Sequence, residues 1–135
     1  MKREPAMNHE TELISSFVVP EKRARYLELL AKPKRRREIL DRLNHCFDIM
    51  PQFATTSNWR LASELERLLR AKGAGDIAHV IADNSELDGL DLPLFEALDG
   101  VLSHQFGSVV SCIPGRLAFY KKEAPGDAFI LERKS

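Results

Sequence analysis

The stretch GAGDIAHVIAD, residues 73–83, decides the fold, because the spacing of apolar residues along the chain changes within it. Before this stretch, apolar residues recur every three or four positions, as they do on one face of a helix. After its two glycines, residues 77–83 form a short run of β-branched and small apolar residues, which is typical of a strand buried on both faces. The sequence therefore predicts helices first and strands afterwards.

Three helices are predicted ahead of this stretch. The first begins at Pro20, since proline suits the first turn of a helix, where its missing N–H would have no partner. Lys32 precedes Pro33 and is therefore disfavoured in the helical conformation, which predicts a break and a second helix starting at Pro33. The third helix follows a polar loop that offers Ser57 or Asn58 as an N-cap.

The N-terminal segment lacks helical periodicity. We expect residues 1–12 to be disordered or frayed, and residues 13–135 to form a single α+β domain. Residues 13–19, with the sequence LISSFVV, have two interpretations: a short strand, or an apolar lead-in to the first helix.

The second half of the chain predicts a sheet of about four strands. Residues 77–83 form its first strand, and Pro93 opens a fourth helix after a turn-rich loop. Residues 108–113, 117–123 and 128–133 then form an antiparallel meander. Because a helix separates the first two strands, we expect them to be parallel neighbours in a right-handed crossover. The predicted fold class is α+β, with three N-terminal helices packed on this mixed sheet.

Charge is divided unevenly along a chain whose formal net charge is zero. Residues 1–72 contain 15 Lys and Arg against 10 Asp and Glu, whereas residues 73–115 contain 7 acids and no Lys or Arg. We call residues 1–72 the basic front and residues 73–115 the acidic middle. Their opposite charges favour ion pairing within the fold or between chains. The balanced total argues against nucleic-acid binding, because nucleic-acid-binding domains usually carry a large positive charge.

The cysteines and the start of the chain indicate a cytoplasmic protein. Cys46 and Cys112 are far apart and form no Cys-x-x-Cys motif, and the first residues are polar where a secretory signal would be apolar. No apolar run approaches the length of about 18 residues that a membrane helix needs. We therefore expect a reducing environment and no membrane contact.

A basic run is the strongest local signal, and its residues are Lys34, Arg35, Arg36 and Arg37. Consecutive helical positions point all round the axis, and acids lie at i to i+4 spacing, so a solvated face is favoured over nucleic-acid contact. In the first turn of a helix, however, the dipole disfavours each cation by about 0.3 to 1 kcal/mol. Compensation is expected from the acidic residues 83–99, from the same residues of a second copy, or from a bound anion.

A candidate ligand-binding set follows the first predicted strand. Asp83, Asn84 and Ser85 lie between that strand and a helix, the position where parallel sheets place ligands, and Arg116 offers a guanidinium after a Pro-Gly pair. The alternatives are an ordinary capped loop and a structural arginine. The spacing of the acids does not match a calcium loop, and no paired His or Cys ligands occur, so no metal or cofactor is predicted.

Catalysis is the alternative reading of Cys112. With His104 or His79 as a base and Asp83 nearby, it would form a nucleophilic site, since such groups need only meet in space. Cys112 lies in an apolar strand, however, where cysteine is usually a buried core residue. The assignment as an enzyme stays open and leans towards no.

The leading prediction is a non-catalytic binding or protein-interaction module, with an unknown protein partner or a second copy of the chain. It rests on the division of charge and on the lack of a combined nucleophile, base and orienting group. The alternatives are a small hydrolase or transferase with a cleft between helices and sheet, and a nucleic-acid or anion binder that uses the basic helices.

Overall fold

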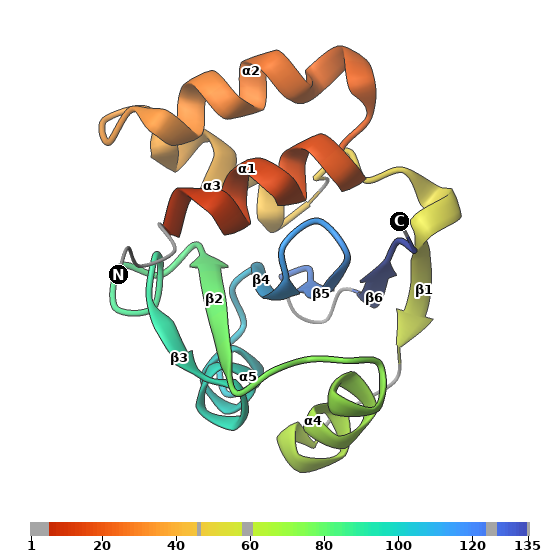
Figure 1. The fold of residues 1–135 in the computed structure, drawn as a ribbon. Helices are drawn as coiled ribbons and strands as arrows, with labels where there is room; N and C mark the ends of the chain where they lie inside the picture. Colours follow the sequence, from red (N-terminus) through yellow and green to blue (C-terminus); the bar gives the residue numbers. More distant parts are fainter. Residues whose placement is uncertain (1–5, 46, 58–60, 124–126, 135) are drawn as a thin grey trace, which may run out of the picture.

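The computed structural model describes residues 6–45, 47–57, 61–123 and 127–134 (Figure 1). The helices are α1 (Ala6–Phe17), α2 (Pro20–Ala31), α3 (Arg36–Leu43), α4 (Ala62–Ala71) and α5 (Leu94–Leu102), with a short 3-10 helix η1 (Pro51–Phe53). The strands are β1 (Ala54–Ser57), β2 (Ile77–Ala82), β3 (Asp91–Pro93), β4 (Ser108–Ile113), β5 (Leu117–Lys121) and β6 (Ala128–Glu132).

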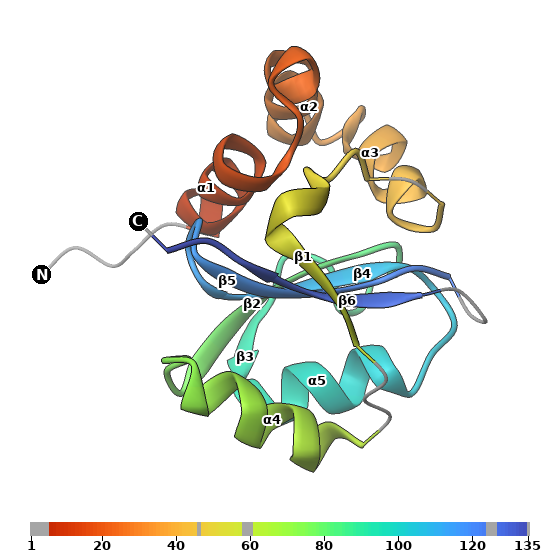
Figure 2. The same ribbon diagram turned by 90° about the vertical axis from the view of Figure 1, so that its right-hand side faces the viewer.

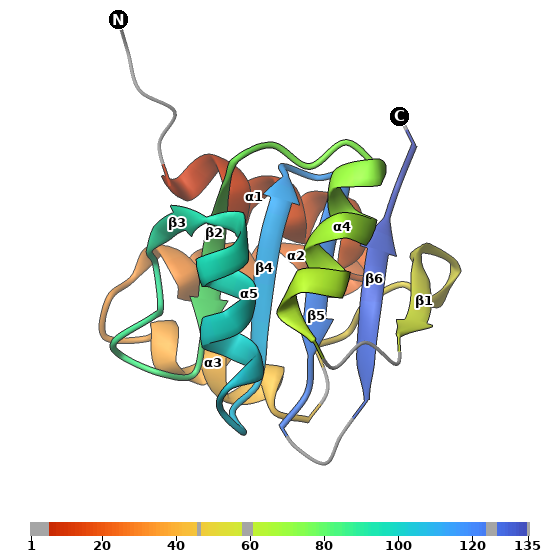
Figure 3. The same ribbon diagram turned by 90° about the horizontal axis from the view of Figure 1, so that it is seen from below.

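The sheet lies between two layers of helices. Within the described residues its strand order is β1-β6-β5-β4-β2-β3, and all neighbouring strands are antiparallel. Figure 2 shows α1, α2 and α3 on one face and α4 and α5 on the other, and Figure 3 views the sheet from the side of α4 and α5. The α+β class is confirmed. The third predicted helix, α4, covers the opposite face from α2 and α3.

The predicted parallel crossover is wrong, because the short strand β3 reverses the chain. β3 pairs antiparallel with β2 and returns the chain to the start of β2, where Ile77 lies opposite Pro93. Helix α5 then carries the chain to the far end of β2, so β4 begins opposite Ala82 and runs antiparallel to β2. One additional strand thus changes the direction of β4, and the sheet is antiparallel instead of mixed.

The N-terminal segment is also more ordered than predicted. Residues from Ala6 onwards belong to α1, whereas a disordered or frayed segment was expected over residues 1–12. Residues 1–5 lie outside the described part of the chain. Leu13, Ile14 and Phe17 are fully buried at helical spacing, and Glu10 continues the same stripe at 7% exposure. A charged residue at a buried position hid the helical pattern.

Helix starts depart from the sequence prediction in two places. α2 spans the predicted residues, but Pro33 lies in a turn and α3 begins at Arg36. α4 begins at Ala62 with no side-chain cap, because Ser57 is the last residue of β1 and Asn58 lies outside the described residues. The predicted polar loop is thus partly an edge strand.

Each face of the sheet carries its own hydrophobic core. The core beneath α1, α2 and α3 contains Leu13, Ile14, Phe17, Tyr26, Ile39, Leu43, Ile81, Val109, Tyr120 and Leu131. The core against α4 and α5 contains Leu65, Leu69, Val80, Leu94, Leu98, Val110, Cys112 and Phe119. The central strands are buried on both sides, which explains their continuous apolar sequence. No helix in the described ranges is long and apolar enough to cross a membrane.

Candidate functional site

The residues of the catalytic alternative do not meet. Cys112 faces the core under α4 and α5 at 7% exposure, and burial raises the pKa of its thiol to about 12. His104 is exposed in the loop after α5, where its ring stacks on Phe106 with centroids 5.1 Å apart. Asp83 contacts neither residue. A protonated thiol without a base is a poor nucleophile, so this geometry offers no support for cysteine catalysis.

The loop after β2 is held by its own hydrogen bonds. Asp83 Oδ2 accepts a 2.8 Å hydrogen bond from Asn44 Nδ2, and the Asn84 side-chain oxygen accepts the backbone N–H groups of Glu86 and Leu87. Ser85 is exposed. Arg116 lies elsewhere, at the turn between β4 and β5. The predicted ligand-binding set is therefore divided between two ends of the sheet, and its first part forms an ordinary Asx-type turn.

The basic run meets the acidic middle of the same chain. The Arg36 guanidinium makes hydrogen-bonded ion pairs with Glu10, at 2.7 and 2.8 Å, and with Asp88, at 2.7 and 2.9 Å. Arg37 lies 3.5 Å from Asp83, and Arg35, the residue before α3, pairs with Glu38 in its first turn. Lys34 is exposed. The compensation expected for the three arginines therefore comes from acids within the same chain, including Asp83 and Asp88 from the acidic stretch.

A buried ionic network links these residues to His79. The His79 ring is fully buried, with Nε2 2.7 Å from Glu10 Oε2 and Nδ1 2.8 Å from Asp91 Oδ1. Carboxylates only accept hydrogen bonds, so both ring nitrogens carry protons and the imidazole is a cation. Asp91, His79, Glu10, Arg36 and Asp88 thus form a chain of alternating charge across β3, β2, α1, α3 and the loop after β2.

The pKa values of the network reflect competition between burial and pairing. Burial alone would raise the pKa of Glu10, but hydrogen bonds and charge interactions with His79 and Arg36 lower it to about 2. Burial likewise lowers the pKa of His79, whereas its bonds to Glu10 and Asp91 raise it by more. In both groups, pairing therefore outweighs burial and favours the charged form.

A neighbouring histidine completes this polar cluster. His9 Nδ1 lies 2.8 Å from Ser111 Oγ, and the His9 ring stacks on His79 with centroids 5.5 Å apart. Ser111 is 1% exposed, so its hydroxyl has no access to a substrate. No group of three or more His, Cys, Asp or Glu residues within the described ranges is arranged to hold a metal ion. We interpret the cluster as structural.

Sequence reasoning missed the network because its members lie far apart along the chain. Glu10 fell in the segment expected to be frayed, and Asp91 fell in an expected loop. The only local signal is the i, i+3, i+4, i+7 spacing of Glu10 with Leu13, Ile14 and Phe17, which marks Glu10 as core-facing once α1 is recognised.

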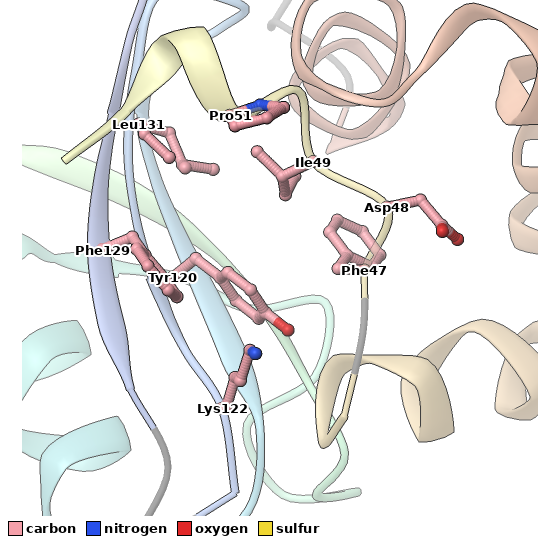
Figure 4. Close-up of a pocket in the computed structure, with 9 residues that line it drawn as sticks. Phe47, Asp48, Ile49, Pro51, Tyr120, Lys122, Phe129 and Leu131 are labelled. Carbon is pink, nitrogen blue, oxygen red and sulfur yellow. The ribbon is translucent and has the colours of Figure 1, made fainter. Parts of the chain in front are cut away.

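An apolar pocket of about 250 Å³ opens on the face that carries α1, α2 and α3. Its lining residues are Phe47, Asp48, Ile49, Pro51, Ala54, Tyr120, Lys122, Phe129 and Leu131. Figure 4 shows Phe47, Ile49 and Pro51 facing Tyr120, Phe129 and Leu131 across the cavity. One wall is thus the segment that follows α3, and the other is formed by β5 and β6.

The first wall is fixed by an unusual backbone conformation. Asp48 has a φ of 54°, in the left-handed region that few non-glycine residues occupy. The segment is tied to the end of α1 because Val19 N donates to Asp48 O at 2.9 Å and Met50 N donates to Phe17 O at 2.7 Å. These bonds set the turn that aims Phe47 and Ile49 at the pocket (Figure 4).

The two charged groups at the pocket differ in their availability. The Asp48 carboxylate points away from the cavity (Figure 4), towards Tyr26 and Arg42, both of which donate hydrogen bonds to it. Hydrogen bonds from Tyr26 and Arg42 hold the pKa of Asp48 below its usual range despite partial burial, which alone would raise it. The Lys122 ammonium instead lies 5.8 Å from the centroid of the Phe129 ring and makes no ion pair within the described residues.

The opposite wall is rigid. Tyr120 is 2% exposed, and its hydroxyl donates a 2.9 Å hydrogen bond to the Leu43 carbonyl. Its ring also packs against Phe47 and Phe129, with centroids 5.8 and 6.0 Å apart. Of these lining residues the sequence singles out Tyr120 alone, as a strand aromatic that could line a pocket, because the two walls come from segments about seventy residues apart. No protein-family model, curated protein or solved structure matches the chain.

Proposed function

We propose that this protein is a non-catalytic binding module, and that the pocket between residues 47–51 and strands β5 and β6 is its ligand site. The observation that carries this proposal is a preformed, largely apolar cavity whose one free charge is the Lys122 ammonium. Binding sites for small molecules commonly combine apolar walls with a few oriented polar groups.

The size of the cavity favours a small ligand. Its volume of about 250 Å³ lies just below the roughly 300 to 1,000 Å³ of pockets for drug-sized molecules. A single aromatic ring or a short aliphatic chain matches this space. Aromatic rings on both walls, Phe47 on one side and Phe129 on the other, suit contact with such a ring.

Lys122 favours an anionic group on the ligand. The Asp48 carboxylate is already paired and points away, so the field at the mouth of the pocket is dominated by the ammonium. The ligand class that fits is a small aromatic or aliphatic carboxylate, with its apolar part in the cavity and its carboxylate at Lys122.

The backbone conformation of Asp48 supports a role of the cavity in ligand binding, as opposed to a role in core packing alone. A non-glycine residue in the left-handed region costs about 1 to 2 kcal/mol and persists only where its surroundings impose it. Here Tyr26, Arg42 and two backbone hydrogen bonds impose it, and the result is an open cavity instead of a closed core. Such preformed walls lower the ordering cost of binding.

The test is a titration of the full chain with phenylacetate, 2-phenylethanol and phenethylamine, followed by amide chemical shifts. These probes share a ring and differ in charge. We expect saturable shifts around residues 47–51 and β6, with affinity falling in that order. The Lys122→Gln variant should bind phenylacetate about fivefold more weakly, the equivalent of roughly 1 kcal/mol for a partly exposed ion pair, and 2-phenylethanol unchanged.

Two matched variants control for indirect effects. Ala54 lines the cavity and Thr55 is exposed beside it on β1, so Ala54→Leu should abolish binding while Thr55→Leu should not. Lys34→Gln makes the same charge change as Lys122→Gln at an exposed position that does not line the cavity. Equal affinity for the three probes, or shifts elsewhere in the chain, would refute the proposal.

A further inference from the structure

We propose that a second site, between α1 and the turn joining β4 to β5, binds a small zwitterion that carries an ammonium and a carboxylate group, such as a free α-amino acid. A groove of about 260 Å³ is lined there by Glu12, Ser16, Pro114, Gly115, Arg116 and Arg133. It shares no lining residue with the apolar pocket.

The groove holds unpaired charges of both signs. Arg116 and Arg133 make no ion pair with any described acid, although the described residues contain many acids. Among the described residues, Glu12 likewise has no cationic partner within 4.0 Å. The groove therefore carries cationic and anionic side chains that do not pair with each other. A ligand with a carboxylate at one end and an ammonium at the other would complement both.

Arg133 is fixed in place. Its Nη1 donates a 2.8 Å hydrogen bond to the Ser16 carbonyl, and its guanidinium lies 4.7 Å from the centroid of the Phe53 ring. Its backbone N–H donates to the Arg116 carbonyl at 2.9 Å, which ties the end of the chain to the turn. A guanidinium held by carbonyl and aromatic contacts retains further N–H donors for a carboxylate, because it has five in all.

The opposite side of the groove is set by Gly115. Its φ of 73° is a left-handed conformation, and a Cβ there would lie 2.8 Å from Ser16 Oγ and 3.2 Å from Glu12 Oε1. The turn therefore approaches α1 closely, and the Glu12 carboxylate lies beside it (Figure 2 shows the β4–β5 end of the sheet next to α1). The Ser16 hydroxyl makes no hydrogen bond within the described residues, so it is an additional donor.

This arrangement places side chains of opposite charge at the two ends of the ligand. The carboxylate would meet the two guanidinium groups, and the ammonium would meet Glu12. A simple anion such as phosphate fits less well, because Glu12 repels it. A simple cation is repelled by both arginines.

The experiment titrates the full chain with L-alanine, propionate and ethylamine and follows the amide shifts of residues 115 and 16. Propionate lacks the ammonium and ethylamine lacks the carboxylate. We expect saturable shifts with L-alanine and at least about tenfold weaker binding of either fragment, since each loses at least one charge-assisted contact.

Exposed side chains allow variants that leave the fold intact. Arg116→Gln and Glu12→Gln should each weaken L-alanine binding about tenfold. Arg67→Gln, an arginine of α4 on the other face of the sheet, should leave it unchanged. Propionate binding as tight as L-alanine binding, or no saturable shift with L-alanine, would overturn the proposal.

Discussion

At the scale of single residues, the defining feature is a histidine that is charged although it is buried. His79 is enclosed on every side, yet both its ring nitrogens lie within 2.8 Å of a carboxylate. Removing a charge from water is costly, and the cost is offset here only because Glu10 and Asp91 accept hydrogen bonds from both ring N–H groups. Arg36 then balances Glu10 from the other side, so no charge in the network is left without a partner.

Replacing His79 should change both the stability and its pH dependence. A raised pKa in the folded state means that protonation stabilises the fold fully below the unfolded pKa of 6.5, and that this contribution is lost as the pH rises through the folded pKa. His79→Gln should therefore lower the free energy of unfolding by roughly 3 kcal/mol at acidic to neutral pH, because the buried carboxylate of Glu10 and the partly exposed one of Asp91 lose a cation. The difference from the unsubstituted protein should shrink as the pH becomes alkaline. Urea unfolding at several pH values measures it.

The same substitution at an exposed histidine provides the control. His104 lies in a surface loop, so His104→Gln should change the unfolding free energy by less than about 0.5 kcal/mol at every pH. If the His79→Gln curve ran parallel to that of the unsubstituted protein over the whole pH range, His79 would not be the cation that we assign.

At the scale of secondary-structure elements, α3 and β4 are joined by a very close backbone approach. A Cβ at Gly107 would overlap the Leu43 carbonyl group and lie 2.7 Å from Asn44 N. The approach is reinforced because Gly107 N donates to Asn44 Oδ1 at 2.6 Å while Asn44 Nδ2 donates to Asp83. The end of α3 is thereby positioned over the sheet, ahead of the segment that forms one wall of the apolar pocket.

Gly107→Ala should therefore be strongly destabilising. The added methyl group can be accommodated only by moving α3 away from β4, and overpacking of this kind costs about 1 to 3 kcal/mol. Gly75→Ala is the matched control, since a Cβ at Gly75 meets nothing within 4 Å and its φ is not in the left-handed region. Thermal unfolding of the two variants should separate them by several degrees. Equal melting temperatures would contradict the close approach.

At the scale of the whole molecule, the basic residues 1–72 and the acidic residues 73–115 form ion pairs with each other within one chain. Acids of the middle region pair with bases of the front region in Asp83–Arg37, Asp88–Arg36 and Asp76–Arg70. Asp91 is paired with His79 inside its own region. Four of the seven acids in residues 73–115 are thus paired within the chain, which leaves fewer of them to attract the basic face of a second copy.

These intramolecular ion pairs predict that charge attraction does not drive self-association. Light scattering should give the mass of a single chain at both low and high salt, because screening has no intermolecular ion pairs to weaken. A mass of two chains at low salt that falls as salt is added would show that charge joins two copies. The high-salt measurement is the internal control.

The elements that sequence alone predicted are those with strong local signals. α2 begins at Pro20, and β2, β4, β5 and β6 follow runs of β-branched and apolar residues. β1 and β3 were missed because three or four polar or proline-containing residues become a strand only when a partner supplies their hydrogen bonds. α1 was obscured by Glu10, which is core-facing only because Arg36 and His79 lie opposite it.

The candidate sites depended even more on tertiary structure. The sequence marked Arg116 as a possible ligand contact, but Glu12 and Arg133, which lie far from it along the chain, were not marked. The walls of the apolar pocket, Phe47 and Phe129 among them, carry no motif that distinguishes them from ordinary core residues. Spatial convergence of unremarkable residues leaves no local pattern to detect.

By itself, the sequence determined the class of the fold, the change from helices to strands within residues 73–83, and the separation of charge, because periodicity and composition are local properties of the chain. Only the tertiary structure decided that the sheet is antiparallel, since the short strand β3 acquires its direction by pairing with β2. It also decided that the two halves of the charge pattern meet within one chain, because ion pairs such as Arg36–Asp88 form between residues that only folding brings together.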